Sequence, residues 1–200
     1  MEFTYSAYRK LLRLLREKDY AFAGYQDYED SPRCVILRHD IDFSLDQAVC
    51  FAELEAKQDV RSTWFVLLRT DFYNAASKAG QEALQFIRSL GHEIGLHFDE
   101  ASYVLPLGRD EMVQSILKET RVSAVSMHRP SQGTLEADYQ IPDVVNSYSR
   151  TFFHEFKSLS DSRRRWREPV EDIVRSGMFD RLHILTHAFW YHEEEESLEE

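Results

Sequence analysis

The sequence predicts an α/β fold in which helices cover a parallel sheet. Short apolar runs typical of buried strands alternate along the chain with segments whose apolar residues recur at helical spacing. The length of 200 residues, with 43% hydrophobic and 30% charged residues, is typical of one globular domain. We therefore expect a single domain over 1–200, with its core at about 33–191 and an acidic, solvated tail at 193–200.

The expected helices and strands follow one another in a regular order. The helices carry apolar residues at spacings of three and four, and one begins with a capping box formed by Ser44 and Gln47. The strands are short apolar runs, and the pattern weakens after Pro130. In chain order we expect a helix at 5–18, a strand at 34–37, a helix at 45–56, a strand at 61–68, a helix at 74–90, a strand within 91–100, a helix at about 109–120, a strand at 122–127, short strands within 144–153 and 157–161, a helix near 169–177 and a strand at 182–187.

The charge and the apolar runs argue against two classes of function. A net charge of −11 argues against nucleic-acid binding, which needs a basic face, and it slightly disfavours an anionic substrate. No run approaches the roughly 20 apolar residues of a membrane span, and the first residues contain no apolar core of signal-peptide length. We therefore expect a cytoplasmic protein without a membrane span.

Polar residues gather where the expected strands end, which is where parallel α/β folds place their chemistry. The segment RHDID places Asp40 and Asp42 on the same side of a strand. Two converging carboxylates need a cation between them or one raised pKa, and a metal ion with a general base meets that need. Alternatively, one aspartate caps the next helix and the other pairs with Arg38.

The segment GHEIGLHFDE contains two histidines, His92 and His97, whose separation of five residues places them on opposite faces of a strand. His97 lies at the C-terminal end of this strand, so we expect it to be a metal ligand. His92 lies at the beginning, so we expect it to be structural. Alternatively, His97 is a core histidine that bonds to the backbone.

Three later segments add candidate residues. MHRP places Arg129 among the carboxylates, where it would orient one of them and lower its pKa, unless it makes only a surface contact. LTHAFWYH ends a strand in His187 and continues into aromatic residues that include Trp190. This arrangement suits a sugar-binding site with a general acid, or alternatively a core aromatic cluster. Taken alone, DSRRRWRE is a basic loop with one buried tryptophan, Trp166. As part of a site, we expect Trp166 and Trp190 to contact the substrate.

Taken in order, the motifs HDID, STWF, GHEIGLH, HRP, DSRRRW and LTH resemble those of the polysaccharide deacetylase family (the NodB-homology domain, carbohydrate esterase family four). More narrowly, they resemble its short branch associated with bacterial surface-polysaccharide gene clusters. The likeness extends over about 33–191. It implies a distorted (β/α) barrel of about seven strands, a divalent metal that is usually zinc, and hydrolysis of N-acetyl or sometimes O-acetyl groups on sugars.

Carried over onto the matching positions, the resemblance implies roles for seven residues. In such a site an aspartate takes a proton from a metal-activated water and a histidine protonates the leaving amine. Asp40 matches the catalytic base, Asp42 and His97 match metal ligands, Arg129 matches the arginine that steadies the base, Asp161 and Trp166 match the pair that buttresses this arginine, and His187 matches the general acid.

One position departs from the family pattern. The family has a second metal-binding histidine four residues after the first, but Ala101 stands at that distance from His97. We expect the carboxylate of Asp99 or Glu100 to replace it, ahead of His128 from a neighbouring strand. A carboxylate ligand would make the site richer in oxygen, so that manganese or magnesium would be tolerated as well as zinc.

The sequence thus predicts a metal-dependent hydrolase that removes acetyl groups from an N-acetylated sugar or saccharide precursor, one linked to a nucleotide or a lipid. Two alternatives remain. The chain could be a catalytically inactive sugar-binding or scaffold domain that has lost the metal. It could also hydrolyse another C–N bond or an ester on the same fold. The oligomeric state is not predicted.

Overall fold

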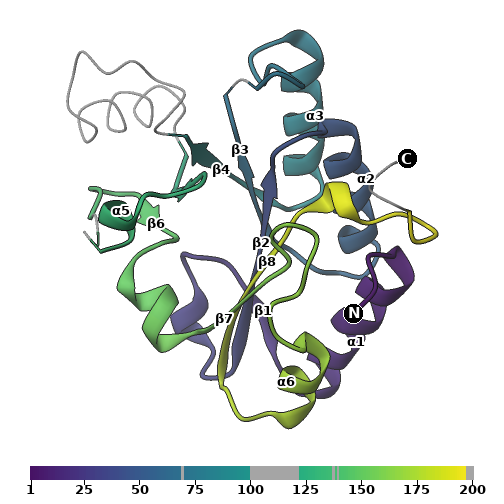
Figure 1. Ribbon diagram of the computed structural model, residues 1–200, viewed down its shortest axis with the longest axis vertical. Coiled ribbons are helices and arrows are strands. Elements are labelled where there is room, and N and C mark those ends of the chain that lie inside the picture. The colour runs from purple at the N-terminus through teal and green to yellow at the C-terminus, as the bar shows by residue number, and fades with distance from the viewer. Residues whose placement is uncertain (69, 100–121, 137, 139, 197–200) are drawn as a thin grey trace.

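The computed structural model describes residues 1–68, 70–99, 122–136, 138 and 140–196 of the chain (Figure 1). In this part of the chain every pair of named strands is parallel. Seven strands follow one another in the order β6-β5-β4-β3-β2-β8-β7, and β1 pairs with β2 as an eighth. The sheet curls into a half-barrel with helices outside it, which confirms the expected distorted α/β barrel.

The strand β2 is central because its eight residues are long enough for three neighbours. Along one edge, β8 pairs with the stretch Cys34–His39. Along the other edge, β1 pairs with the beginning of β2 and β3 with its end. The strands are β1 (Ala21–Ala23), β2 (Cys34–Ile41), β3 (Thr63–Val66), β4 (Glu93–Phe98), β5 (Ala124–Met127), β6 (Val145–Asn146), β7 (Lys157–Ser160) and β8 (Arg181–Thr186).

Helices α1, α2 and α3 lie together on one side of the sheet in Figure 1. Their ends follow from local chemistry, since the Ser44 hydroxyl accepts a hydrogen bond from the Gln47 N–H as the capping box predicts. Gly177 ends α6 in the left-handed region, with φ 62°. The helices are α1 (Tyr5–Glu17), α2 (Leu45–Ala56), α3 (Lys78–Ser89), α5 (Gln132–Glu136) and α6 (Val170–Ser176), with 3-10 turns at Tyr28–Asp30 and Ala188–Trp190 and a π-helical turn at Thr151–Glu155.

Side chains along β2 point alternately to the two faces of the sheet, and one face packs in the core while the other faces the site. Val35, Leu37 and Ile41 are buried in the main hydrophobic core, which also contains residues of α1, α2, α3 and α6. Arg38 and Asp40 have the opposite parity, so their side chains point to the other face of the sheet. The strand therefore contributes to the core with one set of residues and to the site with the other.

A polar network is buried on the helix-covered face of the sheet. Glu55 is fully buried and accepts hydrogen bonds from the hydroxyls of Tyr8 and Ser62, both at 2.5 Å. His39 Nε2 lies 3.0 Å from the same carboxylate. Burial alone would raise the pKa of Glu55, but His39 outweighs that effect and holds it below its usual value. The network joins α1, α2 and β2 through groups that all have partners.

His92 belongs to this buried layer and not to the site. Its Nδ1 accepts the backbone N–H of Ser62 at 3.2 Å, and its Nε2 lies 3.0 Å from the carbonyl oxygen of Ala52. A backbone N–H can only donate, so Nδ1 carries no proton and Nε2 donates to the carbonyl. Burial lowers the pKa of His92, in agreement with a neutral ring. The expected structural role of this histidine is confirmed.

The described elements differ from the expected ones in several places, and α5 was not predicted. The strand β4 begins after His92. Within 144–153 the structure has only the two-residue strand β6 before the π-helical turn. The strand β1 was not predicted, because three residues are too few to show a pattern. The helix expected at 109–120 lies outside the described residues. In the part of the chain that the structure describes, no helix is long and apolar enough to cross a membrane.

Candidate functional site

A cavity of about 600 Å³ opens at the carboxyl ends of the strands, where the sequence places its polar residues. Asp42 follows β2, His128 follows β5 and His187 follows β8, whereas His97 lies within β4. All four side chains line the cavity. The parallel topology therefore brings residues that are distant in the sequence to one end of the sheet.

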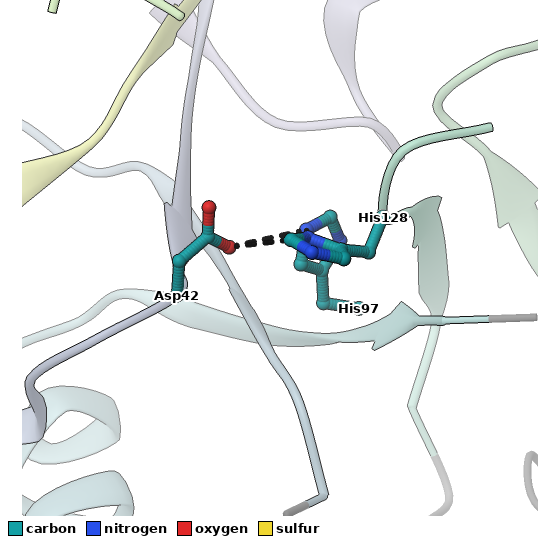
Figure 2. Close-up of side chains that lie close together, drawn as sticks. All are labelled: Asp42, His97 and His128. Carbon is teal, nitrogen blue, oxygen red and sulfur yellow. Dashed lines mark hydrogen bonds and ion pairs between the residues drawn. The ribbon is translucent and has the colours of Figure 1, made fainter. Parts of the chain in front are cut away.

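Three of these residues form a group that could hold a metal ion (Figure 2). Asp42 Oδ1 lies 3.4 Å from His97 Nε2 and 3.5 Å from His128 Nδ1, and the two ring nitrogens are 3.2 Å apart. Asp42 Oδ1 is buried and has no hydrogen-bond partner among the described residues. A bound cation would satisfy a buried carboxylate oxygen that faces two imidazole nitrogens, so these residues fit a divalent metal.

The third member of this group is His128, which the sequence ranked behind the two carboxylates after His97. β5 lies beside β4, and the His128 N–H donates to the carbonyl oxygen of Phe98 at 2.7 Å. This bond places His128 next to His97. Asp99 is not a member of this group among the described residues, and the expectation that Asp99 or Glu100 replaces the missing histidine stays a prediction. Glu100 lies outside the described residues.

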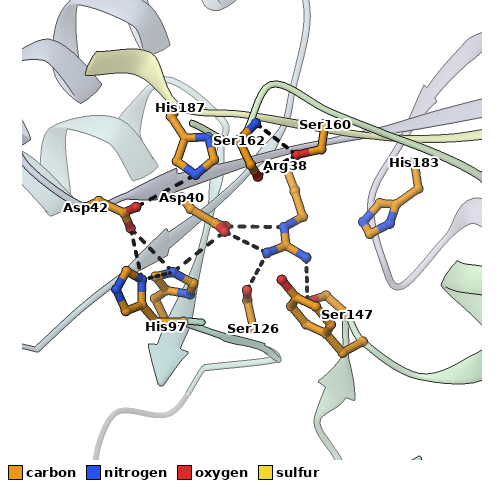
Figure 3. A network of polar contacts seen from close by, with 12 residues as sticks. Arg38, Asp40, Asp42, His97, Ser126, Ser147, Ser160, Ser162, His183 and His187 are labelled. Carbon is orange, nitrogen blue, oxygen red and sulfur yellow. Dashed lines mark hydrogen bonds and ion pairs between the residues drawn. The ribbon is translucent and has the colours of Figure 1, made fainter. Parts of the chain in front are cut away.

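Asp40 is held by Arg38, its neighbour two residues back on the same face of β2 (Figure 3). Arg38 Nη2 lies 2.7 Å from Asp40 Oδ2, and Nε lies 3.2 Å from Oδ1. Ser126 and Ser147 accept further hydrogen bonds from the guanidinium. Burial alone would raise the pKa of Asp40, but Arg38 outweighs it and lowers the pKa below its usual value. Asp40 is therefore ionised at neutral pH.

The pairing corrects the role expected of Arg129. Among the described residues, Arg129 makes no ion pair with Asp40, and its side chain is exposed at the cavity wall. The pair with Arg38 is the one that the sequence offered only as an alternative to metal chemistry. Both descriptions hold together, because Asp40 Oδ2 also lies 3.6 Å from His97 Nε2.

His187 is oriented by Asp161, which follows the neighbouring strand β7. Asp161 Oδ1 lies 2.6 Å from His187 Nδ1, and Oδ2 accepts the backbone N–H of His187 at 3.1 Å. Burial alone would lower the pKa of His187, but the buried Asp161 carboxylate outweighs it and raises the pKa to about 9. Because Nδ1 donates to Asp161, Nε2 faces Asp42 Oδ2 at 3.7 Å. Asp161 thus supports His187, whereas the resemblance gave it the task of buttressing Arg129.

Neither tryptophan expected to contact the substrate is among the described residues that line the cavity. Trp166 packs partly buried against the main core. Trp190 packs against Phe43, with ring centroids 5.7 Å apart. The aromatic residues that do line the cavity are Tyr148 and Phe153, whose rings lie 5.4 Å apart.

His183 is a further cavity residue that the sequence reasoning missed. The Tyr25 hydroxyl lies 2.6 Å from His183 Nε2. Burial raises the pKa of Tyr25, so the phenol keeps its proton and donates it to this nitrogen. Burial, together with the nearby Arg38, lowers the pKa of His183 to about 3. The ring is therefore neutral with its proton on Nδ1. Strand parity could have found this residue, because His183 and His187 are four apart along one face.

Comparison with known proteins adds no assignment: no protein-family model matches the chain, and a search of curated proteins finds no match either.

Proposed function

We propose that the protein is a metal-dependent hydrolase that removes acetyl groups from an N-acetylated saccharide. The observation that carries the proposal is that the group of Asp42, His97 and His128 shares one cavity with an ionised carboxylate, Asp40, which lies 3.6 Å from His97, and a protonated imidazole, His187, which lies 3.7 Å from Asp42. A base and an acid beside a metal group are the parts that amide hydrolysis requires.

We infer that zinc is the metal that this group suits best. Zinc binds imidazole nitrogen and carboxylate oxygen at about 2.0–2.1 Å in a tetrahedron, whose neighbouring ligand atoms lie about 3.3–3.4 Å apart. The three separations here are 3.2, 3.4 and 3.5 Å. Octahedral magnesium at a similar bond length needs ligand atoms about 2.9 Å apart. Two imidazoles also favour zinc over magnesium.

A divalent metal held there would polarise the acetyl carbonyl and lower the pKa of a water molecule. Asp40 is placed to accept one proton from the attacking water, whose oxygen forms the new bond to the carbonyl carbon. Arg38 keeps both oxygens of Asp40 in place for this transfer. His187 gives its Nε2 proton to the nitrogen as the C–N bond breaks, which releases acetate and a free amine.

The rest of the cavity suits a saccharide. Tyr148 and Phe153 offer apolar ring faces to a sugar ring, and His183, on the strand that leads to His187, is a polar residue of the same cavity lining. A few fixed polar groups beside an aromatic surface are typical of small-molecule sites.

The proposal is tested by acetate release from N-acetylated sugars after the purified chain has been loaded with zinc, manganese or magnesium. We expect release that requires the metal and falls at least about 10³-fold in Asp40→Asn, because the variant lacks the proton acceptor. Asp30→Asn, which neutralises an exposed aspartate, should keep full activity. Metal binding without acetate release from any N-acetylated sugar would favour a non-catalytic sugar-binding domain or another amide or ester substrate.

Asp161→Asn should lower the pKa of His187 from about 9 toward the ordinary value near 6.5. The carboxylate raises this pKa by favouring the charged ring, and the amide removes that effect while keeping the shape. NMR titration of the metal-free protein measures the change. Activity needs the protonated ring, so the alkaline limb of the pH profile of activity should move to lower pH.

An unchanged His187 pKa in the variant would show that Asp161 does not control the protonation of the ring. Asp180→Asn, in an exposed ion pair, serves as the control.

A further inference from the structure

Three arginines that take no part in the metal group or in holding Asp40 line the same cavity. Arg129 follows β5, and Arg163 and Arg167 belong to the loop that follows β7. All three side chains are exposed. We call them the arginine wall. Ser160 and Ser162, whose hydroxyls lie 2.6 Å from each other, line the cavity beside it.

The arginine wall has no acidic partner in the described part of the chain. Some exposed arginines elsewhere do have one, as in the pairs of Arg175 with Asp172 and of Arg150 with Asp138. Their neighbour Arg164 points elsewhere, because its guanidinium binds the carbonyl oxygen of Glu196 and lies over the ring of Phe3. The loop therefore places Arg163 and Arg167 at the cavity, whereas Arg164 and Arg165 do not line it.

Two residues of the arginine wall, and also their neighbour Arg164, have a left-handed backbone. Arg129 has φ 46° and Arg163 has φ 62°, both in the left-handed region that residues other than glycine rarely adopt. Such conformations cost roughly 1–3 kcal/mol and persist where the surrounding structure fixes them, often at ligand sites. The strain is not confined to the residues that face the cavity, because Arg164 has φ 53°.

The side chains that line the cavity carry positive charge in excess, although the net charge of the whole chain is −11. Four arginines line the cavity, and among the described lining residues they face the carboxylates of Asp40 and Asp42 alone. Since Asp40 is neutralised by Arg38 and Asp42 belongs to the metal group, the arginine wall has positive charge in excess. The average charge of the chain disfavours an anionic substrate, but an anion entering this cavity meets guanidinium groups first.

We propose that the arginine wall binds a phosphate group of the saccharide, so that the substrate is a phosphorylated N-acetyl sugar. This inference rests on the proposed function for the acetyl group and adds the chemical class of its carrier. Guanidinium groups bind phosphate with paired hydrogen bonds. Three guanidiniums and two hydroxyls supply more donors than the two oxygens of a carboxylate can use, whereas a phosphate group has oxygens for all of them.

Calorimetric titration of the full chain, at matched metal content, tests the inference with N-acetylglucosamine and N-acetylglucosamine 1-phosphate as probes. We expect the phosphate to bind at least about ten-fold more tightly, by a margin that shrinks as salt is added. Arg163→Gln and Arg167→Gln should each weaken binding of the phosphate about ten-fold, the loss of one charge-assisted contact. Arg164→Gln and Arg175→Gln remove the same charge outside the cavity and should bind it as the wild-type protein does.

Equal affinity for the two probes would overturn the inference, as would unchanged phosphate binding in both Arg163→Gln and Arg167→Gln. Equally tight binding of an N-acetylated uronic acid would also overturn it, by showing that a carboxylate suffices. A nucleotide diphosphate sugar distinguishes the two sources of phosphate. Tighter binding of this sugar than of the 1-phosphate indicates a nucleotide carrier, and equal binding indicates a phosphate alone. Phosphate binding that depends on the arginines, without release of acetate, would support the phosphate site and reject only the proposed deacetylase function.

Discussion

His128→Ala should reduce the affinity of the protein for zinc by at least about 100-fold. Loss of a partner that only orients a metal ligand commonly costs 10–100-fold, and loss of a ligand should cost at least as much. Only Asp42 and His97 would remain of the described group. Competition with a chromogenic chelator measures the affinity, and circular dichroism shows whether the fold is retained.

Two controls make this result specific. His154→Ala removes an exposed histidine of the π-helical turn and should leave zinc affinity unchanged. The double variant Asp99→Asn, Glu100→Gln removes the carboxylates that the sequence ranked first as the replacement ligand. If this double variant lost zinc and His128→Ala retained it, the third ligand would be a carboxylate and the group described here would be incomplete.

The fold could be predicted because its signals are local. The alternation of apolar runs and helical spacing, the capping box at Ser44 and the glycine after α6 each act within a few residues. The strand β1 was missed for the same reason, since its three residues depend on pairing with β2 and not on a pattern of their own.

The site could be predicted only where the alternation of side chains along one strand determines which face a residue lies on. This alternation places Asp40 and Asp42 on the same face and His92 and His97 on opposite faces. It also places Arg38 next to Asp40, which the sequence reasoning weighed only as an alternative to a metal site.

The remaining contacts depend on which strands are neighbours. His128 reaches His97 because β5 pairs with β4, and Asp161 reaches His187 because β7 pairs with β8. Strand order is a property of the whole sheet that no single segment encodes. The family pattern suggested Arg129 as the partner of Asp40, but the arginine on the same strand is already in place.

Arg38→Met should lower the free energy of unfolding of the metal-free protein by about 3–5 kcal/mol at neutral pH. The substitution keeps much of the apolar volume but leaves the Asp40 carboxylate, only 5% exposed, without its cation. A buried charge without a partner is more costly than the pair was favourable. Denaturant unfolding followed by circular dichroism measures the change. Arg175→Met breaks an exposed ion pair of the same 2.7 Å length and should cost less than about 1 kcal/mol.

The pH dependence identifies Asp40 as the source of the cost. In the wild-type protein the folded-state pKa of Asp40 is lowered, so its stabilising contribution is present above the unfolded pKa of about 3.9 and is lost as the pH falls through the folded value. In Arg38→Met the largest effect that opposes burial is removed, so the folded pKa of Asp40 rises relative to the wild-type protein, although His97 and His187 still lower it, and ionisation of Asp40 stabilises the fold less. The difference in the free energy of unfolding between the two proteins should therefore be largest at neutral pH and shrink toward pH 4.

Adding Asp40→Asn to Arg38→Met should recover part of the stability and remove this pH dependence. If the single variant lost the same stability at every pH, the cost would come from lost packing and not from the charge.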